Sequence, residues 1–305
     1  MGNFLCRSFT VRLHRAQAVS LLLAAATSLL CSCGVLDQIA EPELFETEIR
    51  CTQLPEDLDG FRIALVTDLH VDSRRHPDYL PRIVQRINEL EPDIVAIAGD
   101  LADGTAAELA PQLGALRKLK SRYGVFGVPG NHDYYSGYPD YMAYLSTLGV
   151  TMLENSHRMI RPDFAVAGIT DPAARGHDLP GPDISAALRG VPKQAFILLL
   201  AHRPQYCVEA AKQGVALQLS GHTHGGLVWG FGPLILRGNS DFVAGLYHVG
   251  DTALYVSRGT AFYSRNRWGD IWRIGVPPEI TLLILRRPAP PRDTSNAPHG
   301  KAKKR

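Results

Sequence analysis

Short apolar runs in this chain end repeatedly at an Asp, Asn or His. The runs, each with the first such residue after it, are 61–67 before Asp68, 94–98 before Asp100, 125–128 before Asn131, 195–201 before His202, and 217–220 before His222. Apolar runs of this length between turn residues are typical of buried strands. Ligands of open α/β sheets bind outside the carboxyl ends of the strands, so we expect these five ends to form one shared site.

Segments with helical periodicity follow each of the first three predicted strands. Residues 79–90, 106–120 and 138–148 carry apolar residues at helical spacing, and further strands are expected at 164–167, 253–257 and 280–285. Alternation of strands and helices predicts an α/β fold. We find no repeat at a fixed period and no internal linker, so we predict one domain over residues 61–286, preceded by a linker and domain start at 34–60.

The first 33 residues have the pattern of a signal peptide or membrane anchor. Arg7, Arg12 and Arg15 precede an apolar run over 16–31. This run is short for a spanning helix, which needs about 20 residues, and suits a secretory signal. The segment Leu30–Cys33 resembles a lipoprotein cleavage box, so lipidation of Cys33 and an uncleaved anchor both stay open. Acidic residues follow the run, which favours a membrane-associated protein of the cell envelope with its body on the extracytoplasmic side.

The remaining composition excludes some classes of partner. Residues 287–305 are rich in Pro, Lys and Arg, which predicts a basic disordered tail. The net charge is +2, and no basic stripe with interleaved aromatics occurs, so we expect no nucleic-acid partner. The two cysteines of the body, Cys51 and Cys207, do not form a disulfide framework, and we predict two unpaired thiols.

The spacing of the polar residues favours metal binding. Asp68 and His70 are two residues apart, as are His222 and His224. Residues i and i+2 at the end of a strand face the same side, so each pair is able to grip one ion. Glycines precede Asp100, Asn131 and His222, where a missing Cβ lets backbone segments come close. Asp171, in Gly-Ile-Thr-Asp-Pro, has the pattern of a turn residue.

The motifs Asp-x-His, Gly-Asp, Gly-Asn-His-Asp, His and Gly-His-Thr-His follow one another over residues 61–224. Together and in this order they resemble the calcineurin-like metallophosphoesterase superfamily. Weaker blocks at 255–259 and 277–281 resemble a bacterial, membrane-associated phosphodiesterase branch of it. The resemblance implies a four-layer αββα sandwich, in which two mixed β-sheets are flanked by helices.

The resemblance also implies a role for each residue of the motifs. Asp68, His70 and His224 would hold one divalent metal ion, Asn131, His202 and His222 a second, and Asp100 would bridge both. A mixed nitrogen and oxygen ligand set suits Mn, Fe or Zn better than Ca. His132 would protonate the leaving group or stabilise the transition state, with Asp133 as a candidate for orienting its ring.

The implied activity is hydrolysis of a phosphoester by a metal-bridging hydroxide. The expected substrate is a phosphodiester or phosphomonoester, either a small molecule or lipid-linked. A second enzymatic hypothesis is a pyrophosphatase that acts on a nucleotide-activated lipid precursor such as UDP-2,3-diacylglucosamine. A third hypothesis, from a different class, is a metal-binding envelope module without turnover.

Overall fold

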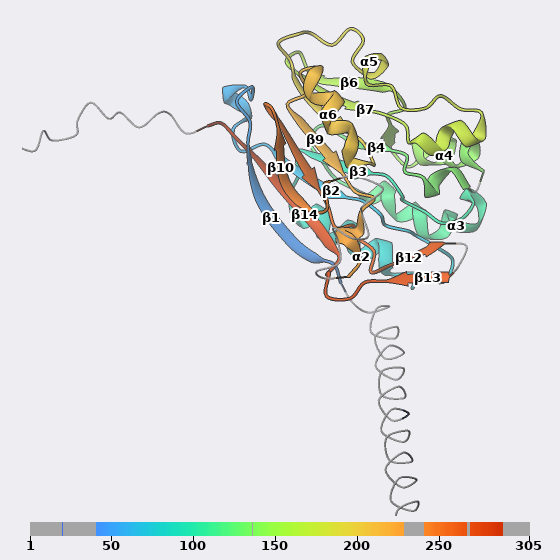
Figure 1. The fold of residues 1–305 in the computed structure, drawn as a ribbon. Helices are drawn as coiled ribbons and strands as arrows, with labels where there is room; N and C mark the ends of the chain where they lie inside the picture. Colours follow the sequence, from blue (N-terminus) through green and yellow to red (C-terminus); the bar gives the residue numbers. More distant parts are fainter. Residues whose placement is uncertain (1–19, 21–40, 136, 229–240, 267–268, 289–305) are drawn as a thin grey trace, which may run out of the picture.

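The computed structural model describes residue 20 and residues 41–135, 137–228, 241–266 and 269–288. The predictions for the leader, including Cys33, and for nearly all of the tail therefore lie outside the described residues. The described part forms two six-stranded sheets and a separate two-stranded hairpin (Figure 1).

The first sheet carries the predicted strands of the N-terminal half together with the last strand of the chain. Its order is β1 (Glu43–Arg50), β14 (Glu279–Arg286), β2 (Arg62–Val66), β3 (Ile94–Ala98), β4 (Val125–Val128) and β5 (Val150–Met152). β14 pairs antiparallel with β2 and parallel with β1, and the strands from β2 to β5 are all parallel.

The second sheet is also mixed. Its order is β10 (Gly245–Val249), β11 (Thr252–Val256), β9 (Leu217–Ser220), β8 (Phe196–Leu200), β7 (Phe164–Gly168) and β6 (Ser156–Arg161). The four central strands are parallel, and each edge strand is antiparallel to its neighbour. The hairpin consists of β12 (Tyr263–Asn266) and β13 (Gly269–Trp272).

Helices complete the domain. The α-helices within the described ranges are α2 (Tyr79–Glu89), α3 (Ala106–Leu113), α4 (Tyr138–Thr147), α5 (Ile184–Ala187) and α6 (Cys207–Lys212). The 3-10 helices are η1 (Glu56–Leu58), η2 (Gly114–Lys118), η3 (His132–Tyr135), η4 (Pro172–His177), η5 (Pro204–Tyr206) and η6 (His224–Gly226). Among the described residues, none of the helices combines the length and the apolar character needed to cross a membrane.

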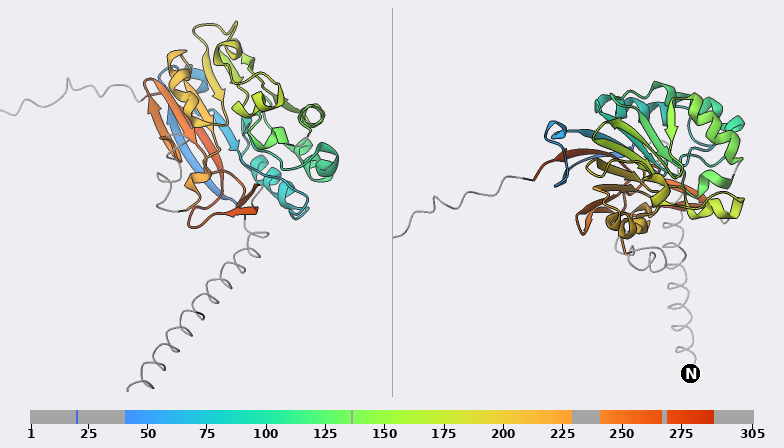
Figure 2. Two further views of the ribbon diagram at one scale, coloured as in Figure 1. Left: turned by 45° about the vertical axis from the view of Figure 1, so that its right-hand side comes forward. Right: turned by 90° about the horizontal axis from the view of Figure 1, so that it is seen from above.

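Successive side chains of a strand point to opposite faces of its sheet, so each strand contributes to two layers of the core. In β2, Ile63 and Leu65 point into a core between the two sheets, whereas Ala64 and Val66 pack toward α2 and α3. β8 behaves in the same way, because its alternate residues contact either the inter-sheet core or the side of α5 and α6. Figure 2 shows the helices on the two outer faces of the paired sheets. The predicted four-layer αββα sandwich is therefore confirmed.

The structure adds strands that the hydrophobic pattern does not indicate. The segment 34–60, predicted as a linker and domain start, contains β1, which pairs along its whole length with β14. β1, β6 and β10 have many exposed or half-buried positions because they lie at sheet edges. The predicted helix at 106–120 is α3 followed by η2. Cys51 and Cys207 are buried free thiols, as predicted.

Candidate metal centre

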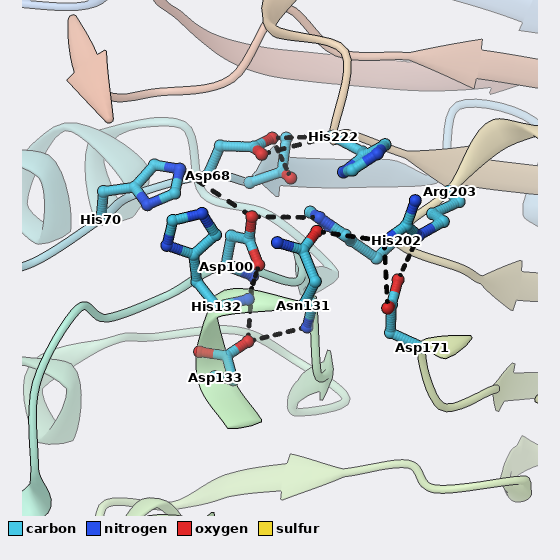
Figure 3. A network of polar contacts seen from close by, with 12 residues as sticks. Asp68, His70, Asp100, Asn131, His132, Asp133, Asp171, His202, Arg203 and His222 are labelled. Carbon is cyan, nitrogen blue, oxygen red and sulfur yellow. Dashed lines mark hydrogen bonds and ion pairs between the residues drawn. The ribbon is translucent and has the colours of Figure 1, made fainter. Parts of the chain in front are cut away.

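The predicted ligands gather where the strand ends of the two sheets meet (Figure 3). Asp68, Asp100 and Asn131 follow β2, β3 and β4 of the first sheet. His202 and His222 follow β8 and β9 of the second sheet, with His224 beginning η6. The site is thus built at the seam between the sheets, and residues from distant parts of the chain meet there.

Asp68, His70 and His224 form the first group of potential metal ligands. One ligand atom of each lies within 4.8 Å of those of the other two. The Nε2 atoms of His70 and His224 are 3.4 Å apart, and His224 Nε2 is 3.4 Å from Asp68 Oδ1. Two imidazole nitrogens and a carboxylate oxygen aimed at one point suit a divalent cation of the nitrogen- and oxygen-binding type.

Asp100, His202 and His222 form the second group, again with ligand atoms within 4.8 Å of one another. Within the described part of the chain, the buried Nε2 of His222 has no hydrogen-bond partner. A buried polar atom without a partner is costly, so this nitrogen fits a place where a metal ion binds. Asn131 lies beside His202 in Figure 3, on the same side as this group.

Asp100 lies between the two groups. The same carboxylate oxygen, Oδ2, is 3.2 Å from His202 Nε2 and 3.9 Å from His70 Nε2. A shared carboxylate of this kind suits the short metal–metal spacing of two-metal sites, roughly 3.5–4 Å. The structure thus brings all seven predicted ligands together, with Asp68, His70 and His224 in one group and Asp100, His202 and His222 in another. Metal binding by each of them stays a prediction.

The backbone at the site adopts an unfavourable conformation. The φ angles of Asp68, His70, Asp100, His222 and His224 are positive, between 42° and 72°. They are five of the nine non-glycine residues with positive φ in the described ranges. Such residues cost on the order of 1–3 kcal/mol each and concentrate at functional sites. The surrounding fold therefore forces the side chains into one cluster against local preference.

Glycines allow the strand ends to approach each other. A Cβ on Gly99, whose φ is +89°, would lie 2.5 Å from His202 Nδ1. A Cβ on Gly130 would collide with Asp100, and one on Gly221 would collide with the side chains of Thr67 and Asp68. The close approach expected from these glycines in the sequence is therefore present.

Partners on the outer side of the ligands orient their rings. His202 Nδ1 lies 2.7 Å from the carbonyl oxygen of Ala98, and His70 Nδ1 lies 3.1 Å from Asp103 Oδ2. When a ring donates its Nδ1 proton in this way, Nε2 keeps its lone pair for a metal. His224 differs, because its Nδ1 is 3.0 Å from Nη2 of the buried Arg273.

His132 is held by Asp103, a residue that the sequence did not single out. Its Nδ1 lies 2.7 Å from Asp103 Oδ1, and its backbone N–H donates to Asp100 Oδ1 at 2.8 Å. Burial lowers the pKa of His132, but the hydrogen bond that its ring donates to Asp103 and the charge of Asp100 outweigh it and raise this pKa to about 9. The ring is therefore a candidate proton donor at neutral pH.

Asp133, the candidate for orienting the ring of His132, makes no hydrogen bond with that ring among the described residues. The Asp133 carboxylate is buried and accepts backbone N–H groups of Gly130 at 2.8 Å and Asp100 at 3.0 Å. It fixes the ends of β3 and β4 to each other. Asp103 comes three residues after Asp100, but its position in a loop gives no signal that its carboxylate faces His132.

Protonation differs sharply between the clustered histidines. Burial, followed by the charges of His202 and Arg203, lowers the pKa of His222 to about 2. Burial also lowers the pKa of His202, yet the Asp100 carboxylate outweighs it and raises this pKa to about 10. A neutral His222 is ready to bind a cation, and a cation beside Asp100 would replace the proton of His202.

Comparison with known proteins agrees with this geometry. Residues 61–226 match the model of the calcineurin-like phosphoesterase family. A transmembrane protein with a metallophosphoesterase domain from Danio rerio is 35% identical over 88% of this chain and 63% of its own length. An uncharacterized metallophosphoesterase of Helicobacter pylori is 36% identical over 83% of this chain and 66% of its own length.

This chain therefore spans just under two thirds of the length of these relatives. Among solved structures, a dimetal phosphatase from Danio rerio aligns over 67% of this chain and 88% of that chain, at 13% identity and a TM-score of 0.44. That similarity is too low to support an assignment, which rests on the sequence match. The matched segment contains all seven predicted ligands and His132, and the chain belongs to the calcineurin-like phosphoesterase family.

Proposed function

We propose that this protein is a phosphoester hydrolase that depends on two divalent metal ions. The observation that supports the proposal best is the division of the ligands into two adjacent groups with Asp100 between them: Asp100 belongs to the second group, and its Oδ2 also lies 3.9 Å from His70 Nε2 of the first. A structural metal site would need one closed group of ligands. Two adjacent groups with a shared carboxylate are the arrangement of two-metal hydrolases.

Bound divalent cations would supply positive charge for the phosphoryl oxygens and lower the pKa of a water molecule. The protein's own side chains would hold the cations and place a proton donor beside them. Asp68 and Asp100 are both buried, and their carboxylates would offset part of the charge of the cations. His132 lies with His70 and Asp100 around a common point. Since Asp103 occupies its Nδ1, its Nε2 is the atom that donates a proton to the leaving oxygen.

The substrate of this proposal is a phosphodiester or phosphomonoester, small or lipid-linked. The basic and apolar leader supports attachment to a membrane through the N-terminus, in the cell envelope. The relative from Danio rerio, which is named a transmembrane protein, supports membrane attachment too. A reporter enzyme fused after Arg286 tests the side of the membrane: activity specific to the extracytoplasmic compartment is expected, and a cytoplasmic reporter signal would contradict the envelope location.

Hydrolysis of bis(p-nitrophenyl) phosphate by the purified full chain tests the activity. With Mn²⁺ we expect turnover, and Asp100→Asn should reduce it to the background rate because both ion sites lose a shared ligand. Asp163→Asn is the matched control, since Asp163 pairs with Arg161 and with no predicted ligand. Metal-loaded protein that hydrolyses neither this diester nor p-nitrophenyl phosphate would favour a metal-binding module without turnover.

A further inference from the structure

An ion pair between Arg203 and Asp171 lies beside the second group of ligands. Arg203 donates from Nε to Asp171 Oδ2 at 2.7 Å and from Nη2 to Asp171 Oδ1 at 3.3 Å. The Asp171 carboxylate is buried and also accepts the backbone N–H of Ala173 at 2.9 Å. A two-point pair with a buried, capped carboxylate fixes the guanidinium plane.

The guanidinium borders the site. Arg203 follows His202 in the chain, and its Nη2 lies 3.5 Å from Oδ1 of Asn131 (Figure 3). Its charge also contributes to the low pKa of His222. The Arg203 side chain keeps 19% of its surface exposed, whereas the Asp171 side chain is fully buried. The guanidinium is therefore accessible where the carboxylate that holds it is not.

A cation at this position needs an explanation, because two divalent ions would repel it. Among the described residues, Arg203 forms its ion pair with Asp171. The charge of Asp171 is neutralised by Arg203, so this carboxylate has no net negative charge left to offset the ions. A guanidinium has five N–H donors, and the two contacts with Asp171 use one edge. Nη1 makes no hydrogen bond or ion pair within the described ranges, so a free donor remains on a fixed group.

We infer that Arg203 is a substrate-binding residue that donates from its free edge to a non-bridging oxygen of a phosphoryl group held beside Asn131 and His222. Asp171 is the positioning residue that keeps the guanidinium group of Arg203 in this orientation. The inference rests on the proposed function for its substrate class. An anion at this place resolves the repulsion, because it meets the guanidinium and the ions together.

Phosphate binding tests the inference without requiring turnover. Isothermal titration of the Mn²⁺-loaded full chain with inorganic phosphate should show that Arg203→Met raises the Kd about 10- to 100-fold, as expected for loss of a charged hydrogen bond. Arg161→Met is the matched control, because Arg161 pairs through Nε with Asp163 and touches no predicted ligand. Its Kd should equal that of the wild type.

Two further measurements separate binding from support of the site. Two manganese ions per chain should remain in Arg203→Met, since the residue is not a ligand. Arg203→Lys should bind phosphate with intermediate affinity because it keeps the charge and loses the fork, and it decides the question if Arg203→Met does not fold. Asp171→Asn should raise the KM for p-nitrophenyl phosphate more than it lowers kcat.

An unchanged phosphate Kd in Arg203→Met, or loss of a manganese ion from it, would overturn the inference. So would a metal-loaded wild type that does not bind phosphate at all, even if it hydrolyses phosphoesters. A wild type that binds phosphate through Arg203 but hydrolyses no phosphoester would contradict the proposed function and leave this inference intact.

Discussion

At the residue scale, Asp103 connects His132, the candidate proton donor, to His70, a candidate metal ligand. Its Oδ1 lies 2.7 Å from His132 Nδ1, and its Oδ2 lies 3.1 Å from His70 Nδ1. One carboxylate thus orients both a candidate ligand of the first ion and the candidate proton donor. Burial raises the pKa of Asp103, but the charge of His70 and the hydrogen bonds from His132 and His70 outweigh it and hold this pKa well below its usual value.

Asp103→Asn should move the pH dependence of turnover. The carboxylate raises the pKa of His132, so its removal lowers that pKa, and the protonated ring is lost at a lower pH. The fall of kcat on the alkaline side should therefore shift to lower pH, by roughly 1–3 units. Steady-state rates across the pH range check this. Asp183→Asn, which changes an exposed helix cap, is the control, and an alkaline limb unchanged by Asp103→Asn would remove Asp103 from this role.

Residue identity at the strand ends made most of the site predictable. Asp68, Asp100 and His222 were found because each follows an apolar run in a recognisable motif. The partner of His132 was not predictable, since the spacing of residues in a loop does not tell which carboxylate faces the ring. Arg203 was missed for a related reason: its function depends on Asp171, 32 residues away.

At the scale of elements, the predicted strands are those buried on both faces. β3 and β8 are buried at every position, and their continuous apolar runs predict them from the sequence. β1 and β10 expose alternate residues at sheet edges, and β5 has three residues, so no such run marks them. Edge strands are specified by pairing with a neighbour far along the chain, as β1 is by β14.

Gly221 follows the last residue of β9, where the ends of two strands lie close together. Replacing it tests whether this close approach shapes the site. Gly221→Ala should push the strand end away from Thr67 and Asp68, with which its Cβ would collide. We expect a loss of about 1–3 kcal/mol in the free energy of unfolding, together with weaker binding of manganese. Urea unfolding and metal titration measure the two effects.

Gly114→Ala provides the comparison, because no atom lies within 4 Å of its Cβ position and its φ is −53°. It should leave metal binding unchanged. Equal effects of the two substitutions would mean that close packing at the end of β9 does not shape the site.

At the scale of the whole molecule, the site joins the two sheets. The first sheet supplies Asp68, Asp100 and Asn131, and the second supplies His202 and His222. A cation bound by both sets links the layers of the sandwich. Such a cation would also give the buried Nε2 of His222 a partner and offset part of the cost of the positive φ angles. Folding stability should therefore depend on metal.

Removal of metal should lower the melting temperature. An ion present at about 100 times its Kd stabilises a folded protein by about 2.7 kcal/mol, and this contribution disappears with a chelator. Thermal unfolding with excess Mn²⁺ and with EDTA measures the difference. Asp100→Asn should show a much smaller difference. A wild-type melting temperature that is the same in both buffers would show that the cluster binds no metal of consequence to the fold.

In the proposed function, two ions that share Asp100 as a ligand make this chain a phosphoester hydrolase. The most direct measurement is the rate of bis(p-nitrophenyl) phosphate hydrolysis by metal-free protein as Mn²⁺ is added in known equivalents at a protein concentration well above the Kd. We expect no activity without metal and a rate that rises until two equivalents are bound. A rate that is independent of metal, or that reaches its maximum at one equivalent, would contradict the account.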